Sequence, residues 1–375
     1  MRVVPQIMTV VFAGLLVVHG LIHMFGVAKA LGWAELPQLS QPISPMFGAL
    51  WLLAALLFFG AAGALFVWPR WWWAIGACAI LISMFLVVRF WSDARFGAIG
   101  NVVVLIGVVF GFLAHGPMSL RTAYEDDVDR ALMRVENAEP IHQEDLAYLP
   151  APVQRYLRAA GVVGLPRVRN FYVRMHGRIR SGREARWMPL SAEQHNFVGD
   201  PARLFYLNAS MFMVPVQGYH RFVGPSATMK VKAAAFVSVV DVSGTEMNEG
   251  ETVTMFNDMC VLAPATLIDA AIQWEPIDDR SARATFTNAG HTIRAELSFN
   301  QAGELTNFWS EDRYQTSADG KTMTKLRWST PLRAYRQFGP VRLASGGEAR
   351  WHDANGNFEY IELTFDEVRY NLRSR

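Results

Sequence analysis

The first 115 residues alternate long apolar runs with short polar breaks. The apolar runs cover about residues 6–28, 46–67, 71–90 and 98–115. Each is long enough to cross a bilayer as a helix, because about 20 helical residues rise about 30 Å. The first run is too long for a signal peptide, and three more follow it. The pattern predicts a four-span transmembrane bundle over residues 1–115, with both termini on one side of the membrane.

A charged, helical connector is expected over residues 116–149. Its apolar positions recur at helical spacing and form one face: Val128, Ala131, Leu132 and Val135. The stretch "LPAPVQRYLRAAG" follows, with Pro152 in its first turn and Gly161 at its end. Proline early and glycine late are typical of a short helix.

The period changes to two near residue 168, where "VRNFYVRMHGRIR" begins a series of strands with one apolar face. Turn sequences such as "NQAG" and "DANGN" separate several of them, which favours hairpins. We expect nine to eleven antiparallel strands. A mostly apolar helical segment interrupts them at about residues 249–273, and Pro264 must kink or split it. The prediction for residues 150–375 is an α+β soluble domain: a curved antiparallel sheet, or half-barrel, with helices across its concave face.

Charge is distributed unevenly along the chain. The net charge is +2, but residues 1–115 hold only five basic and two acidic side chains, leaving 30 basic and 31 acidic residues for the rest. Neither part has the basic surplus typical of nucleic-acid binding. The two cysteines, Cys78 and Cys260, are too few for a disulfide framework or a cysteine-based metal motif.

Several segments resemble a known family. The stretches "HGLIHMFGVAKALG", "QPISPMFGALWLLAAL", "WSDARFGAIGNVV", "LPAPVQRYLRAAGVVG" and "VLAPATLIDAAIQW" are similar to an uncharacterised bacterial family of multi-pass membrane proteins, one of the domains of unknown function. The resemblance implies a bacterial membrane protein and no particular activity. The soluble part is also similar in outline to the half-barrels of LolA-type lipoprotein carriers, which implies an apolar ligand by analogy of fold alone.

Two histidines stand inside the first apolar run. His19 and His23 are four residues apart, so both lie on one helix face. They are candidate metal or haem ligands, although two ligands make an incomplete site; alternatively, both are neutral and hydrogen-bonded to other helices. The connection between the third and fourth spans lies on the same side of the membrane, so Asp93, Arg95 and Asn101 are candidate partners in a polar intramembrane cluster.

Candidate ligand-binding residues in the soluble domain are the apolar positions of the first strand and of the helical segment. They are Phe171, Val173, Met175, Phe256 and Met259. Together they would line an apolar cavity between sheet and helix.

Other polar residues give weaker indications. Asp258 and Asp269 are eleven residues apart, about 16 Å along a helix and too far for one reacting centre, so both are interpreted as solvated helix edge. Five histidines of the soluble domain lack metal-ligand spacing and are interpreted as strand-surface residues: His176, His195, His220, His291 and His352. The nucleophile-elbow, zinc-protease and P-loop motifs do not occur, so no reaction is suggested.

Three functions remain open at this stage. The first is a membrane-anchored binding protein for an apolar molecule, such as a membrane lipid, for sensing or transfer. The second is a membrane-embedded metal- or haem-dependent redox enzyme using His19 and His23, and the third is an interaction scaffold. The expected location is the bacterial inner membrane, and the slight excess of basic groups beside the termini favours cytoplasmic termini.

Overall fold

The structure, a computed structural model, describes residues 3–37, 39–134, 138–211, 214–317 and 322–375, with backbone alone for residues 3–6. The chain divides into two compact units. The helical unit extends to Ala123 and also includes Ala234–Phe236. The β-rich unit comprises Tyr124–Ala233 and Val237–Arg375.

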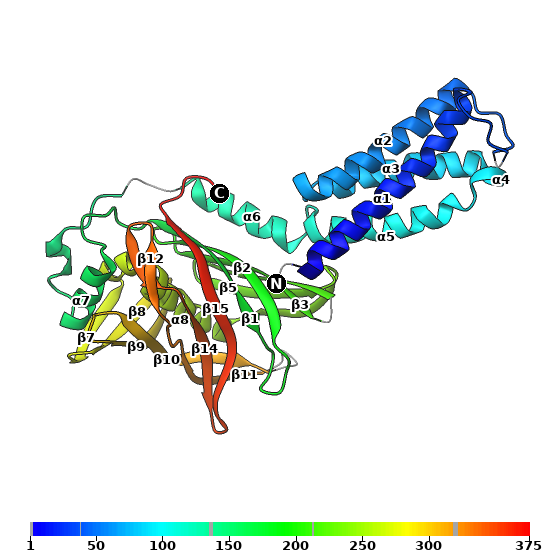
Figure 1. Ribbon diagram of the computed structural model, residues 1–375. Helices are drawn as coiled ribbons and strands as arrows, with labels where there is room; N and C mark the ends of the chain where they lie inside the picture. Colours follow the sequence, from blue (N-terminus) through cyan, green and yellow to red (C-terminus); the bar gives the residue numbers. More distant parts are fainter. Residues whose placement is uncertain (1–2, 38, 135–137, 212–213, 318–321) are drawn as a thin grey trace. The chain divides into compact units, whose positions relative to one another are not determined.

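The helical unit contains the four long helices that the apolar runs predict (Figure 1). They are α1 (Val3–Ala30), α2 (Pro45–Val67), α3 (Trp72–Arg89) and α5 (Gly97–His115), with the single turn α4 (Trp91–Ala94) before the last. Four helical stretches are long and apolar enough to cross a membrane: Ile7–Ala30, Pro45–Val67, Trp72–Arg89 and Gly97–Leu132. The last stretch includes both α5 and α6 (Leu120–Leu132). Helix α6 carries many charged side chains, so α5 is the apolar part of this stretch.

Small residues bring these helices close together. Helix α1 packs on α2, α2 on α3, and α3 on α5. A Cβ atom added to Gly26 of α1 would lie only 2.3 Å from the indole ring of Trp51 on α2. Outward-facing apolar side chains such as Phe25 and Ile106 are exposed. A buried interior of glycine, alanine and aromatic rings with an apolar exterior is typical of helices packed in lipid.

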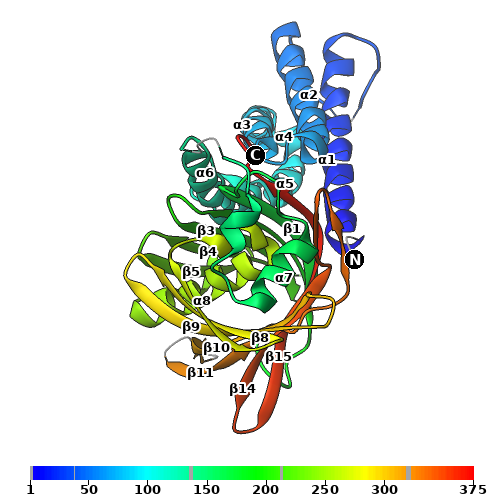
Figure 2. The same ribbon diagram turned by 90° about the vertical axis from the view of Figure 1, so that its left-hand side faces the viewer.

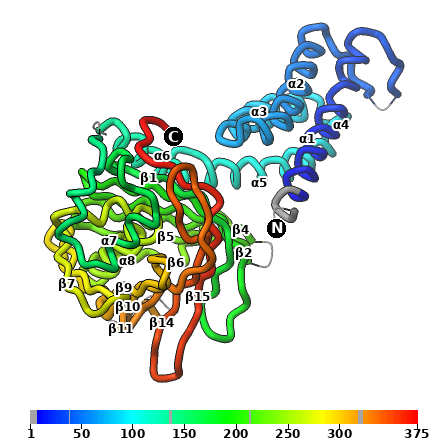
Figure 3. The backbone as a smooth tube through the Cα atoms, turned by 60° about the vertical axis from the view of Figure 1, so that its left-hand side comes forward, coloured from blue at the N-terminus to red at the C-terminus, as the bar shows by residue number. Residues whose placement is uncertain are grey.

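The β-rich unit is built around an antiparallel sheet of 13 strands, in the order β6-β5-β4-β3-β2-β1-β15-β14-β11-β10-β9-β8-β7. Its strands are β1 (Asn170–Ile179), β2 (Met188–Phe197), β3 (Ala202–Met211), β4 (Val214–Val223), β5 (Ser226–Ala233), β6 (Val237–Ser243), β7 (Ile272–Asp278), β8 (Ser281–Asn288), β9 (His291–Phe299), β10 (Leu305–Thr316), β11 (Met323–Ser329), β14 (Gly346–Asp353) and β15 (Gly356–Tyr370). The pairing of β1 with β15 joins the two halves of this sheet. Figure 3 follows the backbone through the long β14–β15 hairpin.

Helix α8 (Thr245–Leu262) lies inside the curve of the sheet (Figure 2). Residues 250–262 are buried on every side of this helix, because the sheet wraps around it. Pro264 ends α8 and begins the short 3-10 helix η2 (Pro264–Ile268), since an interior proline lacks the N–H that continues a helix. The predicted split at Pro264 is confirmed.

Two further helices accompany the sheet. Tyr124 of α6 stacks on Tyr206 of β3, so α6 covers the face of the sheet opposite α8. Helix α7 (Ala151–Ala160) ends at Gly161, whose φ of 77° is the left-handed conformation that glycine adopts easily. The hydroxyl of Tyr156 on α7 donates a hydrogen bond of 2.7 Å to the carbonyl of Cys260, which ties α7 to the end of α8. The 3-10 turn η1 (Gln143–Leu146) precedes it.

The predicted fold class is confirmed: four long apolar helices precede a curled antiparallel half-barrel with a helix on its concave face. The number of strands was underestimated, because the structure has 13 in the main sheet and two more, β12 (Tyr335–Phe338) and β13 (Val341–Ala344), in a separate hairpin. The predicted helix at residues 249–273 was too long at its end, since η2 and the start of β7 occupy that part. Val135 of the predicted connector helix lies outside the described residues.

Candidate functional site

A cavity of about 250 Å³ lies between α8 and the concave face of the sheet. Strands β1, β2, β3, β4, β5 and β15 form one wall, α8 another, and β10, β11 and β14 the third. It reaches the surface beside Glu246 and Thr316, which are exposed. A single water needs only about 10–15 Å³ measured in this way, so the cavity has room for a much larger molecule.

Strand alternation decides which side chains face the cavity. On β3, Arg203, Phe205 and Leu207 line it, while their neighbours Leu204 and Tyr206 point to the opposite face. The apolar part of the lining comes from several strands and from α8: Met175, Ile179, Phe205, Leu207, Met229, Met247, Val261, Leu262, Met323, Trp328, Leu332, Trp351, Ile361, Leu363 and Phe365. Methionine and aromatic side chains make an adaptable apolar surface.

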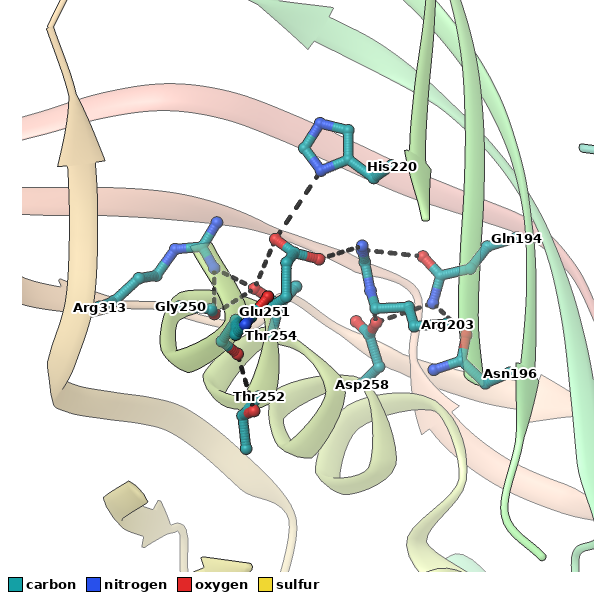
Figure 4. Close-up of polar contacts among 11 residues, drawn as sticks. Gln194, Asn196, Arg203, His220, Gly250, Glu251, Thr252, Thr254, Asp258 and Arg313 are labelled. Carbon is teal, nitrogen blue, oxygen red and sulfur yellow. Dashed lines mark hydrogen bonds and ion pairs between the residues drawn. The ribbon is translucent and has the colours of Figure 1, made fainter. Parts of the chain in front are cut away.

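A buried ion cluster forms the polar part of the lining (Figure 4). The guanidinium of Arg203 donates from Nε to Asp258 Oδ2 at 2.6 Å and from Nη1 to Glu251 Oε2 at 3.0 Å. Gln194 also donates to Asp258 Oδ2, at 2.8 Å, and its own Oε1 accepts from Arg203 Nη2 at 3.2 Å. All four side chains are buried, so each ionised group depends on the others for its stability.

The charge of Arg203 controls the ionisation of Glu251. Burial alone raises the pKa of this carboxyl, but the positive charge of Arg203 and the nearby His220 outweigh that effect and hold the pKa well below its ordinary value. His220 Nδ1 lies 3.7 Å from Glu251 Oε1. Glu251 is therefore ionised throughout the physiological range.

Arg313 provides a second cation beside the cluster. Its Nη1 donates to the carbonyl of Gly250 at 3.1 Å and to the hydroxyl of Thr254, which joins β10 to α8. The guanidinium carbon lies 4.4 Å from the centre of the Trp328 ring and 5.6 Å from that of Trp351. This cation–π placement holds a charge next to an otherwise apolar surface.

Cys260 is not suited to nucleophilic chemistry. It is fully buried, and burial together with the nearby charge of Asp258 raises the pKa of its thiol well above the ordinary value. The thiolate is the reactive form of cysteine, so Cys260 behaves as a small apolar core residue.

The structure separates the five predicted ligand-binding residues. Met175 lines the cavity, whereas Phe171, Val173, Phe256 and Met259 are buried in the surrounding core. The ring of Phe256 stacks on that of Phe286 with centroids 5.0 Å apart. These four side chains therefore pack behind the lining of the cavity and do not face its interior.

The predicted intramembrane cluster is brought together only in part. His19 Nε2 lies 3.0 Å from Asn101 Oδ1, and His23 Nε2 lies 2.9 Å from Ser83 Oγ. His23 Nδ1 lies 2.9 Å from the carbonyl oxygen of His19, so both ring nitrogens of His23 have protein partners. The Ser83 hydroxyl, which sequence reasoning missed, also donates to Asn101 Oδ1 at 2.9 Å.

The other two members of that predicted cluster have different neighbours. Asp93 accepts hydrogen bonds from Ser40 Oγ at 2.7 Å and from the backbone N–H of Gln41 at 2.8 Å. Arg95 places its guanidinium 5.1 Å from the centre of the Phe96 ring. Asp93 thus fixes the connection between α1 and α2.

Three carboxylates of the β-rich unit lie close enough to share a metal ion. Ligand oxygens of Glu348, Glu359 and Glu362 lie within 4.8 Å of one another. Arginines accompany all three, however: Arg350 pairs with Glu348 and Glu359, and Arg178 with Glu362. These ion pairs account for the group without a metal.

Two interpretations of single residues were wrong. Asp258 is not solvated helix edge, because α8 is enclosed by the sheet and Asp258 pairs with Arg203. His195 is not a surface residue either; it is 3% exposed, and its Nδ1 lies 2.7 Å from the Tyr124 hydroxyl. Sequence reasoning missed Arg203. It alternates in step with the apolar residues Phe205 and Leu207, so it lies on the same buried face of β3, and a charged residue there indicates a buried ion pair.

Comparison with known proteins gives a family but no activity. Residues 139–363 match a family of unknown function, DUF6544, which confirms the resemblance seen in the sequence. No curated protein matches the chain.

Three solved structures resemble the β-rich part of the chain. One, from Vibrio parahaemolyticus, is described as an outer membrane lipoprotein-sorting protein domain: it has 9% identity and a TM-score of 0.32, over 54% of this chain and 85% of that one. A DUF1329 family protein from Desulfovibrio piger has 10% identity and a TM-score of 0.27, over 59% and 92%. A LolA superfamily protein from Nitrosomonas europaea has 12% identity and a TM-score of 0.28, over 59% and 94%. At such TM-scores the likeness carries no argument about what this chain binds.

Proposed function

We propose a function for this chain, which belongs to the DUF6544 family of unknown function: its half-barrel binds an apolar molecule, such as a membrane lipid, in the cavity between α8 and the sheet. The observation that carries the proposal is the lining of that cavity. Apolar side chains from strands on both halves of the sheet converge on one space that reaches the surface. A concave, mostly apolar cavity with a few fixed polar groups is the usual form of a small-molecule site.

The driving force would be the transfer of apolar surface out of water. Each square ångström buried contributes about 25 cal/mol, so a ligand chain lying against Phe205, Met229 and Trp328 gains affinity along its length. The ion cluster at Arg203 is already internally paired and can accept a polar end without losing its own contacts.

The helical unit suggests where such a molecule comes from. Among the residues that the structure describes, four helical stretches are long and apolar enough to cross a membrane. A protein attached to a bilayer has lipid as its most abundant apolar neighbour, which supports lipid sensing or transfer as the role of the site.

Native mass spectrometry of the full chain tests this proposal with a matched pair of variants. Met229→Trp fills the cavity, because Met229 lines it. Thr228→Trp places the same ring on the opposite face of β5, since neighbouring strand residues alternate.

The wild-type chain and Thr228→Trp should retain an apolar adduct that Met229→Trp loses. Lipids held by the helical unit would be retained equally by all three proteins. Equal adducts in both variants, or none in the wild type after incubation with phospholipid, would overturn the proposal.

A further inference from the structure

A second pocket, of about 460 Å³, lies on the face of the sheet opposite α8. Its charged lining comes from α6 and the turn after it, from the chain leading into β1, from the β2–β3 turn and from β4: Asp127, Arg130, Arg134, Arg169, Asp200 and Arg221. It shares no lining residue with the cavity inside the curve of the sheet.

Helix α6 builds one wall of this pocket. The Tyr124 hydroxyl lies 2.7 Å from His195 Nδ1, and Asp127 accepts from the Tyr219 hydroxyl at 2.7 Å and from Arg221 Nε at 2.8 Å. These contacts fix α6 on the sheet, so that Arg130, further along the helix, and Arg134, in the turn just after it, border the pocket. The floor is apolar, with Phe197, Leu204 and Val223 among its side chains.

The charge of this lining is strongly one-sided. Four arginines face two aspartates. Asp127 is already shared by Arg130, Arg221 and Tyr219. Arg134 and Asp200 lie 3.3 Å apart with side chains 73% and 74% exposed, and such exposed pairs contribute little. The pocket therefore keeps an excess of positive charge.

Arg169 supplies one of the two positive charges that the aspartates leave unbalanced. Within the part of the chain that the structure describes, its guanidinium makes no hydrogen bond or ion pair to protein, and its buried Nε has no partner. Its backbone N–H, by contrast, is held by Asn371 Oδ1 at 2.7 Å, which fixes the place of the residue. A half-buried guanidinium without an acceptor is costly, and an anion in the pocket would supply one.

We propose that this arginine-lined pocket binds a phosphate group, with Arg169 as its central ligand. Guanidinium groups present paired N–H donors that match the oxygens of a phosphate. The shared chemistry is a phosphate monoester or diester, and two sources would provide it: an anionic phospholipid headgroup or a soluble phosphate compound. The apolar floor would meet the carbon part next to the phosphate.

The test uses the full chain in nanodiscs of phosphatidylcholine. One arm adds inorganic phosphate and follows binding by calorimetry. The other adds phosphatidylglycerol to the nanodiscs and measures its retention by native mass spectrometry. Arg169→Gln is compared with Arg283→Gln, which removes an arginine paired with Glu296 on β8 and β9, away from the pocket.

Arg169→Gln should weaken binding roughly tenfold or more, the range for a hydrogen bond to a charged group, while Arg283→Gln matches the wild type. Binding of inorganic phosphate assigns the pocket to soluble phosphates, and selective retention of phosphatidylglycerol assigns it to headgroups. Arg134→Gln is a second pocket variant in case Arg169→Gln fails to fold. Equal binding by wild type and both pocket variants, or binding of neither probe by the wild type, overturns the proposal.

Discussion

Arg203 stands on the concave face of β3, where its guanidinium meets Glu251 and Asp258 of α8. Glu251 and Asp258 lie 48 and 55 residues after Arg203 in the chain, and all three side chains are buried. Because ionised groups in such a place need partners with good geometry, this cluster fixes the position of α8 against the sheet. It also sets the polar end of the cavity.

Replacing Arg203 by methionine tests that role. The variant Arg203→Met keeps an unbranched apolar stem but leaves two buried carboxylates without their cation. It should lower the free energy of unfolding by about 3–5 kcal/mol, as measured by thermal or denaturant unfolding of the full chain. Arg327→Gln, at an exposed pair with Glu311, should change it by less than about 1 kcal/mol. Similar losses in the two variants would contradict the assigned role.

The same cluster predicts a pH dependence. The pKa of Glu251 is lower in the folded protein than its ordinary value of 4.5, so the folded state binds fewer protons than the unfolded state in acid. The stability that this carboxylate provides is complete above its ordinary pKa and is lost as the pH falls below it. Glu251→Gln should therefore be less stable than the wild type at pH 7, with a gap that narrows towards pH 3. Melting temperatures across that range check this, and a constant gap would contradict it.

Sequence reasoning is weakest at the residue scale. It found the spacing of His19 and His23 and proposed Asn101 as a partner, because helical geometry limits the choices. It missed Ser83, Arg203 and Glu251, because each takes its role from a side chain far along the chain. The only local indication was that Arg203 lies two residues from Phe205 and therefore on the same face of the strand.

At the scale of elements, hydrophobic patterning locates the long helices well. The apolar runs end within three residues of the helices in the structure, since a membrane-length helix is apolar on all sides and needs no periodicity. Proline is equally informative, as Pro264 ends α8 where expected. Strands were harder to count, because β12 and β13 alternate too briefly to be distinguished from a loop.

The close packing of α1 on α2 predicts that a side chain added at the contact lowers stability. Gly26→Ala would place a Cβ atom 2.3 Å from the Trp51 ring near its attachment point, whereas Gly14 has nothing within 4 Å. Overpacking of this kind costs about 1–3 kcal/mol, while alanine at Gly14 gains helix propensity. Gly26→Ala should therefore lower the melting temperature of the purified chain and Gly14→Ala should not. A tolerated alanine at Gly26 would contradict the packing of α1 on α2.

At the scale of the whole molecule, the half-barrel followed from one-sided strands, hairpin turns and an apolar helical segment. The cavity could not be predicted in the same way. Whether a sheet closes on its helix depends on curvature and on the volumes of many side chains, and the sequence states neither. Of the five residues chosen as ligand contacts, only Met175 lines the space, because burial in a core and exposure to a cavity have the same apolar pattern.

The second pocket was also outside the reach of sequence reasoning. Its arginines lie on α6, in the turn after α6, before β1 and on β4, and nothing in their spacing connects them. Their common position follows from the sheet. It places the end of β2, the start of β3 and the end of β4 beside the end of α6.

Photolabelling can locate an apolar ligand inside the half-barrel. The full chain in nanodiscs would be irradiated with a diazirine-bearing alkyl probe, and the labelled residues mapped by peptide mass spectrometry. A ligand in the cavity should give labels on lining positions of β3, β5, α8 and β15, such as Leu207, Met229, Val261 and Leu363. These labels should be lost in Met229→Trp. Labels confined to α1, α2, α3 and α5, with none on these positions, would contradict it.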